Sequence, residues 1–271
     1  MFIYKSGSIF LVILIYVDDI IVIGTHSKSI SKLILSLGHH FAIKDLGSHQ
    51  YFLGIEVHHS ASGLHLSQHK YITNLLARTS MTDSKSFHSP MAFGSAFSIH
   101  DETLLEDGTA YRSVVRALQY CTLTRPDIFF IVNKVYQFMH SPSDIHWQAV
   151  KHILHYLKET SHYGLSIQAT PNYNLTCFTN VDHASSSDDH QNTSSYFVFM
   201  GSNIILWSST KQKVVSCSTT ESKYKVVANG AAELSWIGPL LRELNIAPTL
   251  FLASTMTTLV PTMTANPVFD G

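Results

Sequence analysis

The first part of the chain alternates apolar runs with a pair of acidic residues. Two runs rich in β-branched and aromatic residues, at 10–16 and 20–23, flank Val17, Asp18 and Asp19. Such runs around a polar break predict a β-hairpin with the two carboxylates at its tip. Apolar residues then recur at the helical spacing i, i+3, i+4, i+7, namely at Ile30, Leu33, Ile34 and Leu37. They predict an amphipathic helix that begins near Thr25 or Ser27, because hydroxyl residues are preferred helix caps.

A second hairpin and a second helix are predicted before residue 80. An apolar run at 51–57 is followed by a Ser- and Gly-containing turn at 60–63 and by another apolar run at 64–66. We interpret the two runs as paired strands. Helical spacing returns at Ile72, Leu75 and Leu76. From 80 to about 109 the periodicity is lost and Ser, Asp and Gly accumulate, which predicts a linker.

The remainder of the chain changes from a helical to a strand pattern near residue 170. Three helical patterns run to Leu157 and are separated by Pro126 and Pro142, which interrupt helices. Strand-like runs follow at 175–179, 196–200, 204–207 and 214–217. A last helix is predicted to carry on one face Tyr224, Val227, Ala228 and Ala231. The predicted fold class is therefore α+β, with parts at residues 1–80, 81–168 and 169–271.

Composition narrows the kind of protein. Apolar residues make up 45% and charged residues 14%, which is typical of a compact chain rather than a disordered one. The net charge of −1 gives no overall attraction to phosphate, so nucleic-acid binding would need a local basic patch. The cysteines Cys121, Cys177 and Cys217 are far apart and predict neither a zinc site nor a disulfide framework, which fits an intracellular, reducing compartment.

The apolar run at 9–17 invites interpretation as a signal peptide or membrane anchor. It has no small-residue cleavage site and is stopped by Asp18 and Asp19, well short of the roughly 20 residues that a membrane span needs. We interpret it as a buried strand and expect no signal peptide, no transmembrane segment and no membrane partner.

Asp18 and Asp19 are the residues that point most directly to chemistry. Two-metal phosphoryl transfer needs carboxylates that hold two Mg²⁺ ions, roughly 3.5–4 Å apart, over the attacking and leaving oxygens. A tight hairpin tip is one way to hold such carboxylates rigidly. Taken alone, two aspartates at a β-turn are more often turn residues only.

Motifs around this hairpin follow one another in a recognisable order. The first are Tyr16-Val17-Asp18-Asp19, Lys44-Asp45-Leu46-Gly47, Tyr51-Phe52-Leu53-Gly54-Ile55-Glu56-Val57 and Leu66-Ser67-Gln68-His69-Lys70-Tyr71-Ile72. The later ones are Tyr111-Arg112-Ser113-Val114-Val115, Leu123-Thr124-Arg125-Pro126-Asp127-Ile128, His146-Trp147, Trp207-Ser208-Ser209 and Lys211-Gln212-Lys213. From residue 1 to about 246, the series resembles the reverse transcriptase and RNase H part of copia-type LTR retrotransposon Pol polyproteins.

The resemblance implies roles for several residues. Asp18 would be a catalytic Mg²⁺ ligand with Asp19 beside it, and Phe52, Leu53 and Gly54 would form a hairpin that positions the primer terminus. Without the neighbouring motifs, these last three residues would be interpreted as an ordinary strand. The implied partners are an RNA–DNA hybrid or a primer–template, with dNTP as the small-molecule substrate.

The resemblance also implies an architecture. Residues 1–80 would be a partial palm and thumb, and residues 81–168 a linker and helical connection. Residues 169–271 would be a degenerate and truncated RNase H-like domain, built as a mixed sheet with flanking helices.

Both catalytic centres of the family are expected to be incomplete here. The family's polymerase centre takes a further aspartate from an upstream strand, and no acidic residue precedes Asp18. The three RNase H carboxylate positions align with Asn180, Lys223 and Ala253. A lysine about 5 Å from Mg²⁺ would repel it by roughly 7 kcal/mol at an effective dielectric constant near 20. Asp182 lies about 6.6 Å along the strand from Asn180, too far to replace the lost ligand.

We therefore expect a fragment that has lost both activities when alone. One alternative is an enzyme completed by another chain; a second is a non-catalytic primer–template binding module, to which Lys211, Lys213 and Arg78 would contribute; a third is an inert relic. Arg116 and Glu159 stand where the family usually carries glycine. A side chain larger than glycine would cause strain if the position is closely packed and would be tolerated if the position has free space around it.

Overall fold

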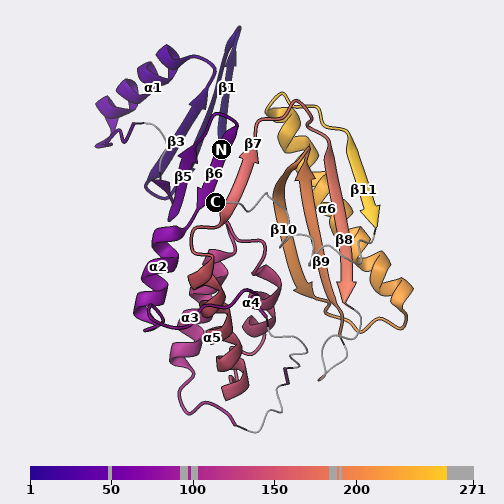
Figure 1. Ribbon diagram of the computed structural model, residues 1–271. Helices are drawn as coiled ribbons and strands as arrows, with labels where there is room; N and C mark the ends of the chain where they lie inside the picture. The colour runs from indigo at the N-terminus through magenta and orange to yellow at the C-terminus, as the bar shows by residue number, and fades with distance from the viewer. Residues whose placement is uncertain (48–50, 92–96, 99–102, 183–187, 189–190, 255–271) are drawn as a thin grey trace.

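A computed structural model describes residues 1–47, 51–91, 97–98, 103–182, 188 and 191–254. Within these ranges the chain forms six helices and three sheets, which confirms the predicted α+β class (Figure 1). None of the helices in these ranges is long and apolar enough to cross a membrane.

The predicted carboxylate hairpin is present in a three-stranded antiparallel sheet at the N-terminus. Strands β1 (Phe2–Ser6), β2 (Ile9–Tyr16) and β3 (Asp19–Gly24) pair in that order. The sequence pattern does not predict β1, which is short and exposes most of its side chains. Helix α1 (Ser27–His40) begins where its pattern predicts, and none of its residues is fully buried.

A second antiparallel sheet joins the N-terminal segment to a strand from far along the chain. Its order is β4 (Tyr51–Phe52), β5 (Ile55–His59), β6 (Gly63–Ser67) and β7 (Gly164–Gln168). The interpretation of 51–57 as one strand is wrong, because the backbone turns at Leu53 and Gly54. The unpredicted β7 pairs with the whole of β6. A strand beyond the helices thus completes a sheet that begins before them.

Four helices share the largest core of the described residues. They are α2 (His69–Arg78), α3 (Thr109–Cys121), α4 (Phe129–Tyr136) and α5 (Asp144–Glu159), all four of which follow predicted helical patterns. The fully buried side chains of this core include Ile72, Leu75, Tyr111, Leu118, Val132, Ile153 and Leu157. Helix α2 therefore packs with residues on the far side of residue 80. The three-part division of the chain stays a prediction about ancestry, since no break in packing coincides with that position.

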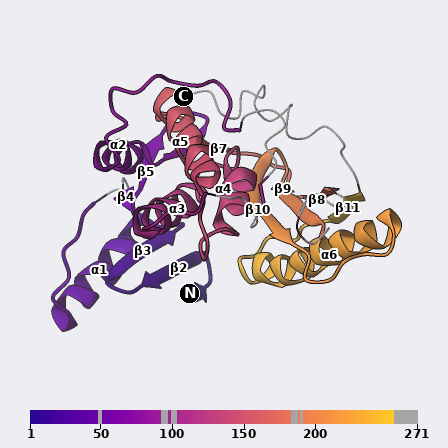
Figure 2. The ribbon, with the colours of Figure 1, turned by 90° about the horizontal axis from the view of Figure 1, so that it is seen from below.

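A mixed sheet forms the C-terminal part, as the sequence predicts. Its order is β10 (Asn203–Lys211), β9 (Thr193–Met200), β8 (Leu175–Asp182) and β11 (Leu250–Ser254), with β11 parallel to β8 and the other pairs antiparallel. Helix α6 (Thr219–Glu243) covers one face, where it packs on Leu175, Cys177 and Val198 with Leu234, Ile237 and Leu241. The other face meets α4, where the rings of Phe129 and Phe197 lie 5.2 Å apart. Figure 2 shows α6 along one side of this sheet, with α4 and α5 on the other.

Two details of this C-terminal part differ from the sequence prediction. Residues 214–217 form no strand, and Val214 and Val215 are exposed. The predicted stripe of α6 is not its buried face, since Tyr224 is 72% exposed whereas Val226, Leu234 and Leu241 are buried. Small and apolar residues occur on both sides of this helix, so periodicity alone does not select the face.

Arg116 and Glu159 are both exposed, so the larger side chains are tolerated at these positions.

Figure 1 places the helical core below the two N-terminal sheets, with the mixed sheet and α6 at its side.

A buried ion pair closes the helical core near the end of α5. Arg125 is fully buried and donates to the two carboxylate oxygens of Asp127 at 2.9 and 2.7 Å. It also donates to the carbonyl and hydroxyl oxygens of Thr160 at 2.7 Å each. Tyr156 donates its hydroxyl to Asp127 at 2.8 Å. Burial opposes ionisation of Asp127, but the charge and hydrogen bonds of Arg125 and the Tyr156 bond hold its pKa below the ordinary value.

We expect Asp127→Asn to lower the free energy of unfolding by about 3–5 kcal/mol, because it leaves the buried Arg125 charge without its partner. Since the pKa of Asp127 is lowered by folding, the stability that it contributes is present above the ordinary value of 3.8 and is lost as the pH falls below it. Urea denaturation measures the difference, which should shrink at about pH 3. Glu243→Gln, at an exposed position, should cost less than about 0.5 kcal/mol. Equal losses in both variants would contradict this role of the pair.

Candidate functional site

The two aspartates lie at the end of the hairpin formed by β2 and β3. Tyr16 pairs with Asp19, so the turn consists of Val17 and Asp18. Asp18 is exposed and Asp19 is half-buried. Val17 is 85% exposed and has a φ of 54°, a left-handed conformation that a β-branched residue rarely adopts. The hairpin thus presents its carboxylates on a strained two-residue turn.

A second tight turn lies between β4 and β5. Its central residues Leu53 and Gly54 have φ angles of 47° and 71°, as a two-residue hairpin turn requires. Phe52 ends β4 and pairs with Ile55. The backbone thus has the hairpin that the family resemblance implies; its role at a primer terminus stays a prediction.

Tyr120 of α3 lies against the second turn and near the first. Its hydroxyl donates to the carbonyl oxygen of Leu53. Burial raises the pKa of Tyr120, and the nearby phenols of Tyr51 and Tyr16 raise it further. Tyr16 ends β2, so a tyrosine close to each turn interacts electrostatically with Tyr120. Tyr120 thus contacts the predicted primer-positioning segment directly, and its pKa responds to the residue that precedes the carboxylate turn.

The residues of the mixed sheet that align with the family's RNase H carboxylates are not gathered on one face. Asn180 alternates along β8 with Thr179, which is buried on the side that α6 covers, so Asn180 lies on the opposite side. Lys223 is exposed on α6. Ala253 on β11 pairs with Phe178 of β8. The identity of Asn180, Lys223 and Ala253 as the family's ligand positions stays a prediction.

The acids near this sheet are engaged separately or lie apart. Glu221 accepts a hydrogen bond from the backbone N–H of Cys217 at 2.8 Å and pairs with Lys225 at 2.7 Å. Asp182 is exposed at the end of β8. Its charge raises the pKa of Lys134, although burial lowers that pKa by more. In the described part of the chain, no group of three or more His, Cys, Asp or Glu side chains could hold a metal ion.

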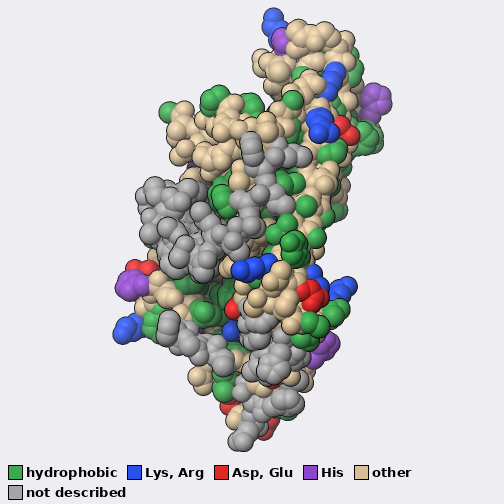
Figure 3. All heavy atoms as spheres, turned by 90° about the vertical axis from the view of Figure 1, so that its right-hand side faces the viewer, with side chains coloured by type: hydrophobic (Ala, Val, Ile, Leu, Met, Phe, Trp, Pro, Cys, Tyr) green, Lys and Arg blue, Asp and Glu red, His purple; other side chains and the backbone are tan. Residues whose placement is uncertain are grey.

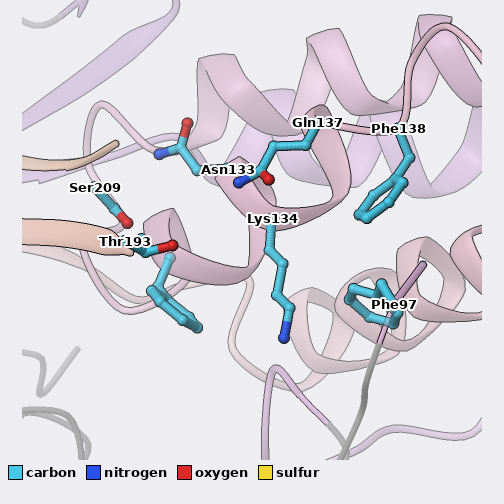
Figure 4. A pocket seen from close by; sticks show the side chains of 8 residues that line it. Phe97, Asn133, Lys134, Gln137, Phe138, Thr193 and Ser209 are labelled. Atoms are coloured by element: carbon cyan, nitrogen blue, oxygen red, sulfur yellow. The ribbon is translucent and has the colours of Figure 1, made fainter. Parts of the chain in front are cut away.

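A small pocket lies between α4 and the strands β9 and β10. Figure 4 shows Asn133 and Lys134 of α4, and Gln137 just after it, opposite Thr193 and Ser209 of the strands. The Ser209 hydroxyl is buried without a hydrogen-bond partner, and the Lys134 ammonium lies 5.0 Å from the centre of the Phe97 ring. The cavity volume of about 20 Å³ is enough for one or two water molecules and too small for a nucleotide.

One face of the molecule shows how the charged side chains of the described residues are distributed (Figure 3). On the face seen in Figure 3, Lys and Arg side chains are scattered among apolar and uncharged ones. This agrees with the net charge of −1. Binding of a polyanion such as a nucleic acid would therefore depend on individual contacts and not on overall electrostatic attraction.

Sequence patterns do not identify Tyr120 or Gln68 as residues near the site. Gln68 is fully buried, its amide donates to the Tyr120 carbonyl at 3.2 Å, and it accepts from the Thr124 hydroxyl at 2.9 Å. Gln68 and Thr124 belong to motifs of the resemblance, but nothing in their spacing signals that they meet.

Comparisons with known proteins agree with the resemblance. A family described as reverse transcriptase (RNA-dependent DNA polymerase) matches residues 1–93. The Pol polyprotein of the Arabidopsis thaliana transposon RE2 is 39% identical over an alignment that covers the whole chain and 19% of that polyprotein. An uncharacterised mitochondrial protein of Arabidopsis thaliana is 40% identical over 83% of the chain and 93% of its own length. The Pol polyprotein of the tobacco transposon TNT 1-94 is 34% identical over 89% of the chain and 19% of its own length. No solved structure matches the chain significantly.

We expect Val17→Gly to raise the free energy of unfolding by about 0.5–1 kcal/mol, because relief of the left-handed strain outweighs the added freedom of the unfolded chain. Chemical denaturation of the purified protein measures this. Val214→Gly is the matched control, since Val214 is also exposed but has no positive φ. Glycine there should leave stability unchanged or lower it. A loss of stability in Val17→Gly equal to that of the control would show that the turn is not strained.

Proposed function

The chain belongs to the family of copia-type retrotransposon Pol polyproteins, and we propose that it is a remnant of their reverse transcriptase and RNase H that by itself completes neither catalytic centre. Residues 1–80 would derive from the palm and thumb, 81–168 from the linker and helical connection, and 169–271 from a degenerate RNase H-like domain. The chain spans 19% of the Pol polyproteins RE2 and TNT 1-94, so their activities are proposed here as ancestry.

The observation that carries the proposal is the small number of acidic side chains at the hairpin of β2 and β3. Asp18 and Asp19 are adjacent residues of one hairpin, and the described residues add no third ligand that would form a metal-binding group with them. Two Mg²⁺ ions in near-octahedral coordination need carboxylates that reach both ions from more than one strand. The residues present therefore do not fit a two-Mg²⁺ centre, although the pair keeps the hairpin that such a centre would use.

The mixed sheet supports the same conclusion independently of the exact alignment. On the face of β8 that α6 covers, the residues near the N-terminus of the helix are Thr179 and Val181. On the opposite face, Asp182 follows Asn180 at the end of the strand. Among the described residues, neither face gathers three carboxylates.

Non-catalytic binding of a primer–template is the second candidate function. The observation that favours it is a pair of exposed tyrosines beside the two turns: Tyr16 is 57% and Tyr51 is 55% exposed. Aromatic faces stack on unpaired bases without sequence preference, at roughly 1–3 kcal/mol per base. Such stacking would support weak binding in a chain whose net charge is −1.

We expect no primer extension on a primed RNA template and no cleavage of an RNA–DNA hybrid by the purified 271-residue chain with Mg²⁺ and dNTPs. An active reverse transcriptase in the same buffer serves as the positive control. Mg²⁺-dependent extension that is lost in Asp18→Asn would overturn the proposal for the polymerase centre. Hybrid cleavage that is lost in Asp182→Ala would overturn it for the RNase H-like domain.

If the chain binds a primer–template, Tyr16→Ala and Tyr51→Ala should each weaken binding by about five- to a hundredfold, the equivalent of one lost stacking contact. Fluorescence anisotropy with a labelled primer–template at low salt measures the affinity. Tyr224→Ala removes an even more exposed tyrosine from α6 and should leave binding unchanged. Equal weakening by all three variants would mean that the site is elsewhere.

A further inference from the structure

The turn between β4 and β5 is not stable on its own. Strand β4 has two residues and makes only the pairs Tyr51↔Glu56 and Phe52↔Ile55. Strand β5 is held by its pairing with β6, but β4 is a two-residue edge strand that β5 alone pairs with, so its end of the turn is weakly held. Its turn also places Leu53 at a φ of 47°, which costs a side-chain-bearing residue conformational energy. A contact from elsewhere in the chain must therefore hold the turn.

Tyr120 provides that contact through both its hydroxyl and its ring. The hydroxyl donates to the Leu53 carbonyl oxygen. A Cβ added at Gly54 would lie 3.0 Å from the Tyr120 Oη and 3.1 Å from Cε1, so the absent side chain lets the turn rest on the ring. Gly54 thus meets two requirements, a φ of 71° and close approach to Tyr120.

Tyr120 is itself fixed by the helical core. Its ring lies 5.0 Å from the ring of Tyr71 on α2. Its carbonyl oxygen accepts a hydrogen bond from the fully buried Gln68, just before α2. The Tyr71 hydroxyl reaches the Ala117 carbonyl of α3 at 3.5 Å. Tyr71 of α2 therefore holds the ring of Tyr120, and Gln68, just before α2, holds its backbone.

We infer that Tyr120 is a positioning residue that holds the Leu53–Gly54 turn in place against the helices α2 and α3. Movement of α3 against α2 would shift the Leu53–Gly54 turn. Helix α3 lies outside residues 1–93, which match the reverse transcriptase family, so an element beyond that match governs the geometry of the turn. The inference rests on the proposed function only where it assigns the turn to a primer end.

The first test uses Tyr120→Phe, which removes the hydroxyl and keeps the ring. Amide hydrogen exchange at residues 51–57 should speed up about tenfold, the equivalent of one lost hydrogen bond. Tyr111→Phe is the matched control, because Tyr111 lies on the same helix and donates its hydroxyl to the Val135 carbonyl at 2.6 Å, within the same core. It should lower global stability without selective exchange at 51–57. Equal exchange at 51–57 in both variants would overturn the inference.

A second variant approaches the contact from the turn. Gly54→Ala should push the turn away from Tyr120 and speed exchange at 51–57 while leaving α3 protected. Gly38→Ala is its control, since a Cβ there meets nothing within 4 Å. Unchanged exchange in Gly54→Ala would also count against the inference.

Binding separates this inference from the proposed function. A primer–template with a fluorescent base at the primer 3′ end should report a changed environment in Tyr120→Phe and none in Tyr111→Phe. If the wild-type chain binds no primer–template, the primer role fails, while the exchange measurements still decide whether Tyr120 holds the turn.

Discussion

Helices α2 to α5 bury their apolar faces against one another, and each of the two larger sheets is attached to the core that results. Strand β7 leaves α5 and completes the sheet of β4, β5 and β6. Phe129 of α4 packs on Phe197 of the mixed sheet. Tyr120 of α3 meets the turn between β4 and β5. The buried pair of Arg125 and Asp127 binds Thr160, between the end of α5 and the start of β7, so a charged interaction in the core fixes where β7 leaves it.

The proposed function separates the fate of the fold from the fate of the chemistry. The N-terminal hairpin carries two adjacent acids on a strained turn, and the chain also has a second tight turn at Leu53 and Gly54. In the proposed alignment, the RNase H positions of the C-terminal part carry an amide, an ammonium and a methyl group. A hairpin needs only local backbone preferences, whereas a metal centre needs several charged side chains at one place. Replacement of a few acids would therefore leave such a fold intact and remove its metal chemistry.

Element prediction succeeded where the apolar pattern has a clear period or a clear break. The hairpin at Asp18–Asp19 consists of two apolar runs on either side of a polar break, and helix α1 and the helices of the core repeat apolar residues at helical spacing. It failed at 51–57, where an apolar run hides a turn made by a leucine and a glycine with positive φ angles. It also failed at 214–217, where β-branched residues lie in an exposed loop because no neighbouring strand pairs with them. On α6, small residues on several sides left the buried face undetermined.

The sequence by itself determined the family, the α+β class and the identity of the acids that remain, because motif order, hydrophobic period and residue type are all local properties of the chain. Only the tertiary structure decided that β7 returns to β6, that Asn180 and Lys223 lie on different sides of a strand, and that Tyr120 rests on the turn at Leu53 and Gly54. Each of these depends on which surfaces bury one another across a separation of tens of residues or more. The packing of the whole core decides which surfaces meet, and the local pattern of one segment does not contain that information.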